Sequence, residues 1–152
     1  MTHKGNLLLV DDERNLLLSM EELLKLRGYQ TTIAEGGQAA LDLLDTQDFD
    51  LVILDLNMPH VSGHDVLRHI QENQYSFTVI VVSGESSFEA VSEALKLGAY
   101  DYLRKPYAAD GLLTTIGNAV SKTQLERQNK QIQKKLADSE KLHRYIVEHR
   151  QT

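Results

Sequence analysis

Short apolar runs alternate along the chain with segments whose apolar residues recur at helical spacing. Residues 7–10 within the segment 6–10, and residues 51–54 and 79–82, form continuous apolar runs, and each run is followed by an acidic or hydroxyl residue. Such runs are typical of strands buried on both faces of a parallel sheet. In residues 29–33 apolar and polar positions alternate, which predicts a half-exposed edge strand. Residues 100–103 predict a fifth strand.

Five amphipathic segments lie between and after these strands. Gly28 and Gly98 follow two of them as helix stop signals. The segment Ser86-Ser87-Phe88-Glu89 matches a capping box at the start of another. The residues that carry the helical spacing are Leu16, Met20, Leu23 and Leu24; Ala39, Ala40, Leu43 and Leu44; Val66, Leu67 and Ile70; Val91 and Leu95; and Leu112, Leu113, Ile116, Ala119 and Val120.

Strict alternation of strands and helices predicts an α/β fold with right-handed crossovers and helices on both faces of the sheet. We expect a flavodoxin-like, doubly wound, five-stranded parallel sheet of strand order 2-1-3-4-5. Sheets of this kind bind ligands in the crevice beyond the carboxyl ends of their strands. The residues that follow the strands are therefore the first candidates for chemistry.

Reactive side chains follow four of the five predicted strands. Asp11 and Asp12 follow the first, Asp55 the third in chain order, Ser83 the fourth and Lys105 the fifth. Taken singly, an aspartate or serine after a strand is usually a helix cap, and a lysine is usually a solvated surface charge. Their joint placement favours one shared site.

The chemistry of that set indicates phosphoryl transfer. Three carboxylates repel one another unless a cation joins them, and Mg²⁺ prefers carboxylate and phosphate oxygens. The ammonium of Lys105 and the hydroxyl of Ser83 would complete a phosphate site. An aspartate can itself be the nucleophile and form an acyl phosphate, and Asp55, which follows a central strand, is the best candidate.

Two other functions fit this fold less well. A phosphohydrolase of the haloacid-dehalogenase type needs a second aspartate two residues after its nucleophile as general acid. Asn57 stands at that position and cannot donate such a proton, and the chain has no segment for a substrate cap domain. A flavodoxin-like cofactor binder needs a Ser-, Thr- and Gly-rich loop after its first strand, whereas Asp11-Asp12-Glu13 would repel a phosphate in the absence of a metal. We therefore favour a signalling switch over an enzyme.

Composition and charge exclude several kinds of site and partner. The chain of 152 residues contains no cysteine, which excludes disulfides and thiolate metal sites and suits a reducing cytoplasm. No apolar run approaches the length of about 18 residues needed for a membrane span. Residues 1–120 contain 8 basic and 18 acidic residues, so the body is a poor nucleic-acid binder, whereas residues 121–152 contain 8 basic and 4 acidic residues.

The residues at the strand ends resemble the receiver domain of bacterial two-component response regulators. The resemblance rests on Asp11-Asp12, on Asp55-Leu56-Asn57-Met58-Pro59 with Gly63, on Ser83, and on Lys105-Pro106. It covers residues 5–121, and we take residues 1–121 as the receiver domain. It implies that Asp55 accepts a phosphoryl group from a sensor histidine kinase or a phosphotransfer protein.

The resemblance also implies a role for each neighbouring residue. Asp11, Asp12, Asp55 and the backbone carbonyl of Asn57 resemble the Mg²⁺ ligands. Ser83 and Lys105 resemble the pair that contacts the phosphoryl group. The Lys105–Pro106 bond is expected to be cis.

Three further residues are expected to act in switching. Tyr102 resembles the aromatic residue that turns inward as Ser83 moves toward the phosphate. Asn57 and Glu85 stand at the two variable positions that tune the lifetime of the phosphoaspartate. The surface that reports the change is expected within residues 91–119.

The segment 122–152 is predicted to continue the fifth helix as a linker. Leu125, Ile132, Leu136, Ser139, His143 and Ile146 follow coiled-coil spacing, with Asn129 at a core position. A solvated helix and a frayed linker are the alternatives, and we favour a parallel homodimer. No helix-turn-helix segment follows, so we expect no direct contact with nucleic acid. Residues 139–148 resemble the helix that leads into a PAS domain, which implies an output domain beyond the sequence, such as a histidine kinase or a cyclic-di-GMP enzyme.

Overall fold

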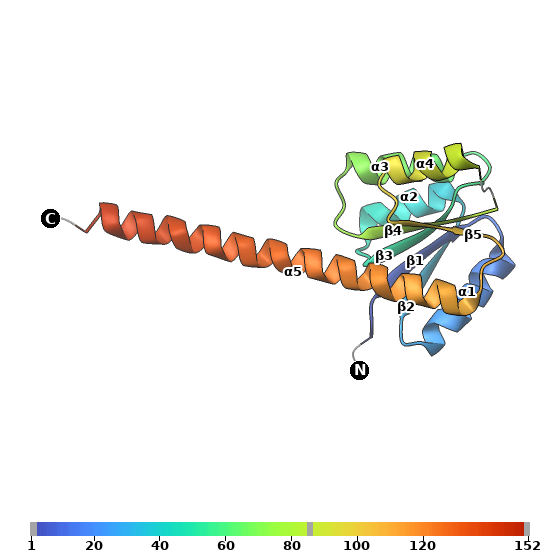
Figure 1. Cartoon of the computed structure of the whole chain (residues 1–152), viewed down its shortest axis with the longest axis horizontal. Helices are drawn as coiled ribbons and strands as arrows, with labels where there is room; N and C mark the ends of the chain where they lie inside the picture. Colours follow the sequence, from blue (N-terminus) through green and yellow to red (C-terminus); the bar gives the residue numbers. More distant parts are fainter. Residues whose placement is uncertain (1–2, 85–86, 151–152) are drawn as a thin grey trace.

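A computed structural model describes residues 3–84 and 87–150 of the chain (Figure 1). Strands and helices alternate throughout, and all neighbouring strands are parallel. The sheet order β2-β1-β3-β4-β5 confirms the predicted topology. The elements are β1 (Asn6–Asp11), α1 (Arg14–Leu26), β2 (Gln30–Glu35), α2 (Gly37–Thr46), β3 (Leu51–Asp55), α3 (Gly63–Glu72), β4 (Thr78–Ser83), α4 (Phe88–Lys96), β5 (Asp101–Arg104) and α5 (Ala109–Glu148).

The sheet separates two hydrophobic cores. Helices α2, α3 and α4 cover one face, while α1 and the first part of α5 cover the other (Figure 1). Along β1, Leu8 and Val10 pack into the first core, and Leu7 and Leu9 pack into the second. Because both faces are covered, the central strands need apolar residues at successive positions, which explains the continuous apolar runs.

Helix α4 corrects two expectations. Its N-cap is Ser87, one residue later than the capping-box pattern predicted, and the Ser87 side chain accepts a hydrogen bond from the backbone N–H of Ala90. Ser86 lies outside the described residues. The residues buried against the sheet are Ala90 and Ala94, whereas Leu95 is 48% exposed. The helical spacing predicted from the sequence rested on the bulky residues Val91 and Leu95, but this helix packs against the sheet through its alanines.

Helix α5 confirms the predicted long last helix. It contains 40 residues, and its buried residues end at Thr123. Most of the remainder projects from the body as a single rod (Figure 1). Within the described part of the chain, no helix is both long enough and apolar enough to cross a membrane.

Candidate functional site

The site forms where the strand order reverses between β1 and β3. Asp11 is the last residue of β1, Asp55 the last of β3 and Ser83 the last of β4. Because all strands are parallel, these carboxyl ends lie at one edge of the sheet. Lys105 follows β5, and its backbone N–H donates to the carbonyl of Ser83 at 2.9 Å, which places the lysine beside the same edge.

The charged groups of the site are in direct contact. The Nζ atom of Lys105 lies 2.7 Å from Oδ2 of Asp11 and 3.6 Å from Oδ2 of Asp55. Carboxylate oxygens of Asp11, Asp12 and Asp55 all lie within 4.8 Å of one another. Asp11 and Asp55 are each only 5% exposed, whereas Asp12 is open to solvent. The structure thus brings together four residues that sequence reasoning assigned to one site.

Backbone amides hold the two buried carboxylates in place. The N–H of Glu13 donates to Oδ1 of Asp11 at 3.0 Å, and the N–H of Asn57 donates to Oδ1 of Asp55 at 3.4 Å. The side-chain amide of Asn57 also donates to Oγ of the fully buried Ser83 at 3.2 Å. Sequence reasoning missed this last contact, because nothing in the local pattern links two residues at the ends of different strands.

Burial and mutual repulsion shift the ionisation of the cluster. Burial, and then the charge of Asp11, raise the pKa of Asp55 from 3.8 to about 6, although the positive charge of Lys105 opposes both effects. Burial, and then the hydrogen bond with Asp11, raise the pKa of Asp12. Burial alone would lower the pKa of Lys105, but its hydrogen bond to Asp11 and the charge of Asp55 raise it overall. Three carboxylates therefore share one ammonium group and leave an excess of negative charge.

Close packing beneath Asp55 fixes the turn that follows it. A Cβ atom at Gly63 would lie 2.3 Å from the carbonyl oxygen of Asp55 and 2.5 Å from Cα of Leu56. Only glycine permits this approach, which lets α3 begin directly against the end of β3. Ser62 and Asp65 form a reciprocal capping box that satisfies the first backbone N–H groups of α3.

The remaining predicted site residues lie around this cluster. The Lys105–Pro106 peptide bond is cis. Tyr102 is half-buried on β5 and packs against the core formed with α2, α3 and α4. Glu85 lies outside the described residues.

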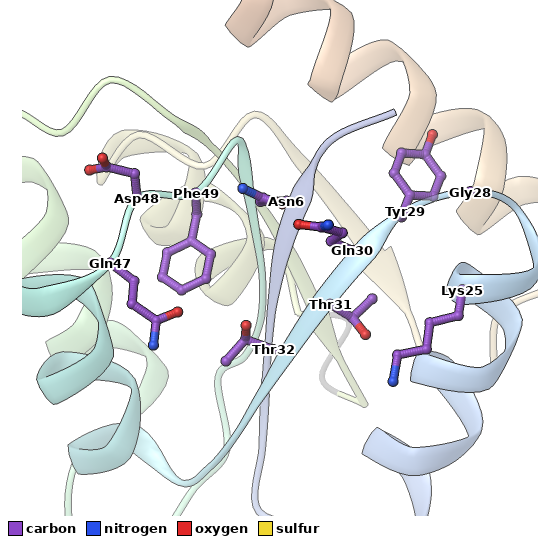
Figure 2. Close-up of a pocket in the computed structure, with 10 residues that line it drawn as sticks. All are labelled: Asn6, Lys25, Gly28, Tyr29, Gln30, Thr31, Thr32, Gln47, Asp48 and Phe49. Atoms are coloured by element: carbon purple, nitrogen blue, oxygen red, sulfur yellow. The ribbon is translucent and has the colours of Figure 1, made fainter. Parts of the chain in front are cut away.

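A polar hollow occupies a different part of the molecule. It has a volume of about 480 Å³ and lies around the edge strand β2 and the start of β1 (Figure 2). Asn6, Gln30 and Asp48 are among the residues that line it. All three lie at or before the amino ends of strands, so the hollow is separate from the carboxylate cluster at the carboxyl ends.

A doubly wound sheet with a carboxylate cluster, a lysine and a buried serine at its carboxyl edge defines a class of phosphate-handling switch domains. The response regulator receiver domain family matches residues 7–117, so the chain belongs to that family. It is a receiver domain of the two-component response regulators. Domains of this family bind Mg²⁺ at an acidic pocket, and the cluster of Asp11, Asp12 and Asp55 is the corresponding feature here.

Individual relatives agree with this assignment. The transcriptional regulatory protein FixJ of Bradyrhizobium diazoefficiens is 33% identical over 120 residues, which are 79% of this chain and 58% of FixJ. The response regulator SaeR of Staphylococcus epidermidis is 34% identical over 122 residues, 80% of this chain and 52% of SaeR. The chain therefore spans only about half the length of these relatives.

Solved structures show the same fold. The receiver domain of a LuxO repressor protein from Vibrio parahaemolyticus superposes with a TM-score of 0.78 and 31% identity, covering 82% of this chain and 95% of that chain. Full-length FixJ from Bradyrhizobium japonicum gives a TM-score of 0.77 and 29% identity, covering 90% of this chain and 68% of that chain.

Proposed function

We propose that Asp55 is the phosphoacceptor of this receiver domain and that Mg²⁺ bound beside it supports the reaction. The observation that carries the proposal is the position of Asp55: a buried carboxylate at the end of a central strand, 3.6 Å from the ammonium of Lys105. With a pKa of about 6, Asp55 is mostly ionised at neutral pH and can act as a nucleophile.

In the proposed reaction, an oxygen of Asp55 attacks the phosphorus atom of a phosphohistidine on the donor. An O–P bond forms, the N–P bond breaks, and the bonding electrons return to the imidazole ring. The product is an acyl phosphate with a charge of about −2 in place of a carboxylate. Lys105 neutralises part of that charge. The hydroxyl of Ser83, which accepts from the side-chain amide of Asn57, donates its own proton to a phosphoryl oxygen.

The carboxylate cluster fits a Mg²⁺ ion. Two ligands on opposite sides of Mg²⁺ are about 4.2 Å apart, so oxygens spread over 4.8 Å need to close only slightly. Asp11, Asp12, Asp55 and the backbone carbonyl of Asn57 would hold the ion. When bound, Mg²⁺ supplies positive charge against the negative charge of the carboxylates and of the phosphoryl group.

The proposed switch is a two-state equilibrium that the new charge biases. Movement of Ser83 toward the phosphoryl group is coupled to Tyr102, and the change reaches the surface formed by α4, β5 and the start of α5, within residues 91–119. Asn57 and Glu85 tune how long the acyl phosphate persists.

Intact mass after incubation with acetyl phosphate tests this function. A Mg²⁺-dependent gain of about 80 Da, the mass of one phosphoryl group, is expected in the natural protein and is lost in Asp55→Asn or with EDTA. Asp48→Asn, an exposed carboxylate outside the site, is the matched control and should gain the same mass. Labelling that persists in Asp55→Asn would show that another residue is the acceptor.

The proposed partners are a sensor histidine kinase or phosphotransfer protein that supplies the phosphoryl group in the cytoplasm, and an output domain that receives the signal through the segment 122–152. The relatives support an output domain because the chain covers 28% of the transcriptional regulatory protein ZraR of Escherichia coli and 58% of FixJ. We further propose that the projecting part of α5 forms a parallel coiled-coil homodimer.

The exposed face of α5 supports this dimer. Leu125, Ile132, Leu136 and Ile146 are each between 50% and 60% exposed, although they recur on one stripe. In a parallel pair in register, Lys135 of one copy would face Glu140 of the other, a complementary pair at the flanking positions. Analytical ultracentrifugation should show that Leu136→Asp dissociates the dimer while Lys130→Asp, on the outer face, leaves it intact. Equal sedimentation of both variants and the natural protein as monomers would refute it.

A further inference from the structure

A polar cluster that the proposed chemistry does not use lies at the amino ends of the strands, opposite the proposed phosphorylation site. It joins the amino ends of β1, β3 and β4 to α5. Asp50 stands immediately before β3, and Thr78 is the first residue of β4. Thr123 and Arg127 belong to α5 and lie beyond residue 117, where the family match ends. The cluster therefore joins residues inside the matched segment to the part of α5 that lies beyond it.

Arg127 reaches back from α5 onto the loop before β3. Its Nη1 atom donates to Oδ1 of Asp50 at 2.5 Å, and its Nη2 atom donates to the carbonyl of Phe49 at 2.6 Å. Its Nε atom donates to Oγ of Ser76 at 3.2 Å. The planar guanidinium thus holds two loops at once, which a lysine ammonium at the same position would not reproduce.

A buried hydroxyl pair completes the junction one turn earlier. Oγ1 of Thr123 lies 2.8 Å from the carbonyl of Asp50 and 2.6 Å from Oγ1 of Thr78. The carbonyl of Ala119 lies 3.2 Å from the same Thr123 atom. Since each hydroxyl has one proton, Thr78 donates to Thr123 when Thr123 donates to either carbonyl. Both threonines are buried.

Asp50 is the centre of the junction. Its second carboxylate oxygen accepts the backbone N–H of Asn6, the first residue of β1, at 2.7 Å. Packing here is tight, because a Cβ atom at Gly5 would lie 3.2 Å from Oδ2 of Asp50 and 3.3 Å from Cγ1 of Val120. Asp50 therefore ties β1 and α5 to the strand that ends in Asp55.

We propose that Asp50 and Arg127 are positioning residues that lock the projecting part of α5 to the receiver sheet and set the direction in which it leaves. The helix docks through Thr123, and the Asp50–Arg127 contact extends that docking by one turn before the helix becomes fully exposed. The strands held at this end, β3 and β4, are the strands whose other ends carry Asp55 and Ser83. In its functional meaning the proposal rests on the proposed function, because the locked helix is the segment that carries the phosphorylation signal onward.

Two measurements on the full chain test the lock without phosphorylation. The chain has no cysteine, so spin labels can be attached at Gln47→Cys on the body and Asp138→Cys on the projecting helix, diluted with unlabelled protein so that only distances within one chain are read. Arg127→Ala should broaden the distance distribution and make amides of residues 124–130 exchange at least about threefold faster, since these groups then open locally. Lys130→Ala, which removes a neighbouring positive charge, is the matched control and should change neither.

A double-mutant cycle distinguishes the contact from a general loss of structure. Asp50→Asn keeps an oxygen for the N–H of Asn6 but loses the charge that Arg127 meets. If the contact is the lock, Asp50→Asn and Arg127→Ala should each accelerate exchange, and combining them should add little further acceleration. An unchanged distance distribution and unchanged exchange in Arg127→Ala would overturn the proposal, as would full additivity of the two substitutions.

Labelling with acetyl phosphate separates this proposal from the proposed function. Arg127→Ala lies far from the site in sequence and contacts none of its residues, so it should gain a phosphoryl group as the natural protein does. Failure of the natural protein to gain a phosphoryl group from either acetyl phosphate or a histidine-phosphorylated kinase would refute the role of Asp55 and leave the lock to be judged by the spin-label and exchange results alone.

Discussion

Replacing Asp55 by asparagine should stabilise the fold at neutral and alkaline pH. The pKa of Asp55 rises from 3.8 to about 6 in the folded protein, chiefly because the carboxyl is buried and faces Asp11. Between these two pH values the folded state binds a proton that the unfolded state has released. The unfolding free energy therefore falls as pH rises through this window, and the favourable contribution of protonated Asp55 is fully present only below pH 3.8.

The magnitude follows from the shift. An increase of about 2 pKa units corresponds to about 3 kcal/mol of lost stability once Asp55 is ionised, at about 1.36 kcal/mol per unit. Water that reaches the mouth of the site reduces this figure, so we expect Asp55→Asn to be about 1–3 kcal/mol more stable than the natural protein at pH 8. Asparagine occupies nearly the same volume and carries no charge, so packing changes should be small.

Urea unfolding followed by circular dichroism checks this prediction at a series of pH values from 4 to 8. The stability difference between Asp55→Asn and the natural protein should be large at pH 8 and should shrink toward pH 4. Mg²⁺ should stabilise the natural protein at pH 8 more than the variant, because the ion screens the same repulsion. The exposed Asp48→Asn serves as control. A difference that is the same at both ends of the range, or an asparagine variant that is less stable at pH 8, would refute the electrostatic reasoning.

Two further predictions concern the packing beneath Asp55 and the charge beside it. Gly63→Ala should destabilise the fold by about 1–3 kcal/mol in urea unfolding, because its Cβ atom would meet the backbone of Asp55. Gly111→Ala is the control: its Cβ atom would enter open space, so the substitution should stabilise helix α5 by about 0.5–1 kcal/mol. Equal effects of the two substitutions would contradict this packing. Lys105→Met should raise the pKa of Asp55 above about 6, because the lysine charge opposes the upward shift. A titration of the Asp55 carboxyl followed by NMR would measure this change, and a lowered pKa would contradict the contact between Lys105 and Asp55.

Much of the fold and most of the site were readable from the sequence for one physical reason. Strands buried on both faces must be apolar at every position, so the first polar residue after each run marks a strand end. Asp11, Asp55 and Ser83 each occupy such a place, and parallel strands bring these ends to one edge. The sequence alone thus predicted that these three residues would meet Lys105 at one site.

Other features depended on distances between residues that are remote in the chain. The face that α4 buries was decided by how closely the helix approaches the sheet, and that approach selected Ala90 and Ala94 over Leu95. The pKa of Asp55 depends on burial and on its separation from charges on other strands.

The junction of α5 with the sheet shows the same limit most clearly. Asp50 and Arg127 are 77 residues apart in sequence and meet only because the sheet and α5 are already packed. In the sequence alone, Asp50 is one acid in a loop and Arg127 one cation in a basic helix. No local pattern around either residue predicts that the two are in contact. A periodic pattern records what each segment must bury, whereas the pairing of charges across segments is settled only when the packed fold sets their distances and excludes water from between them.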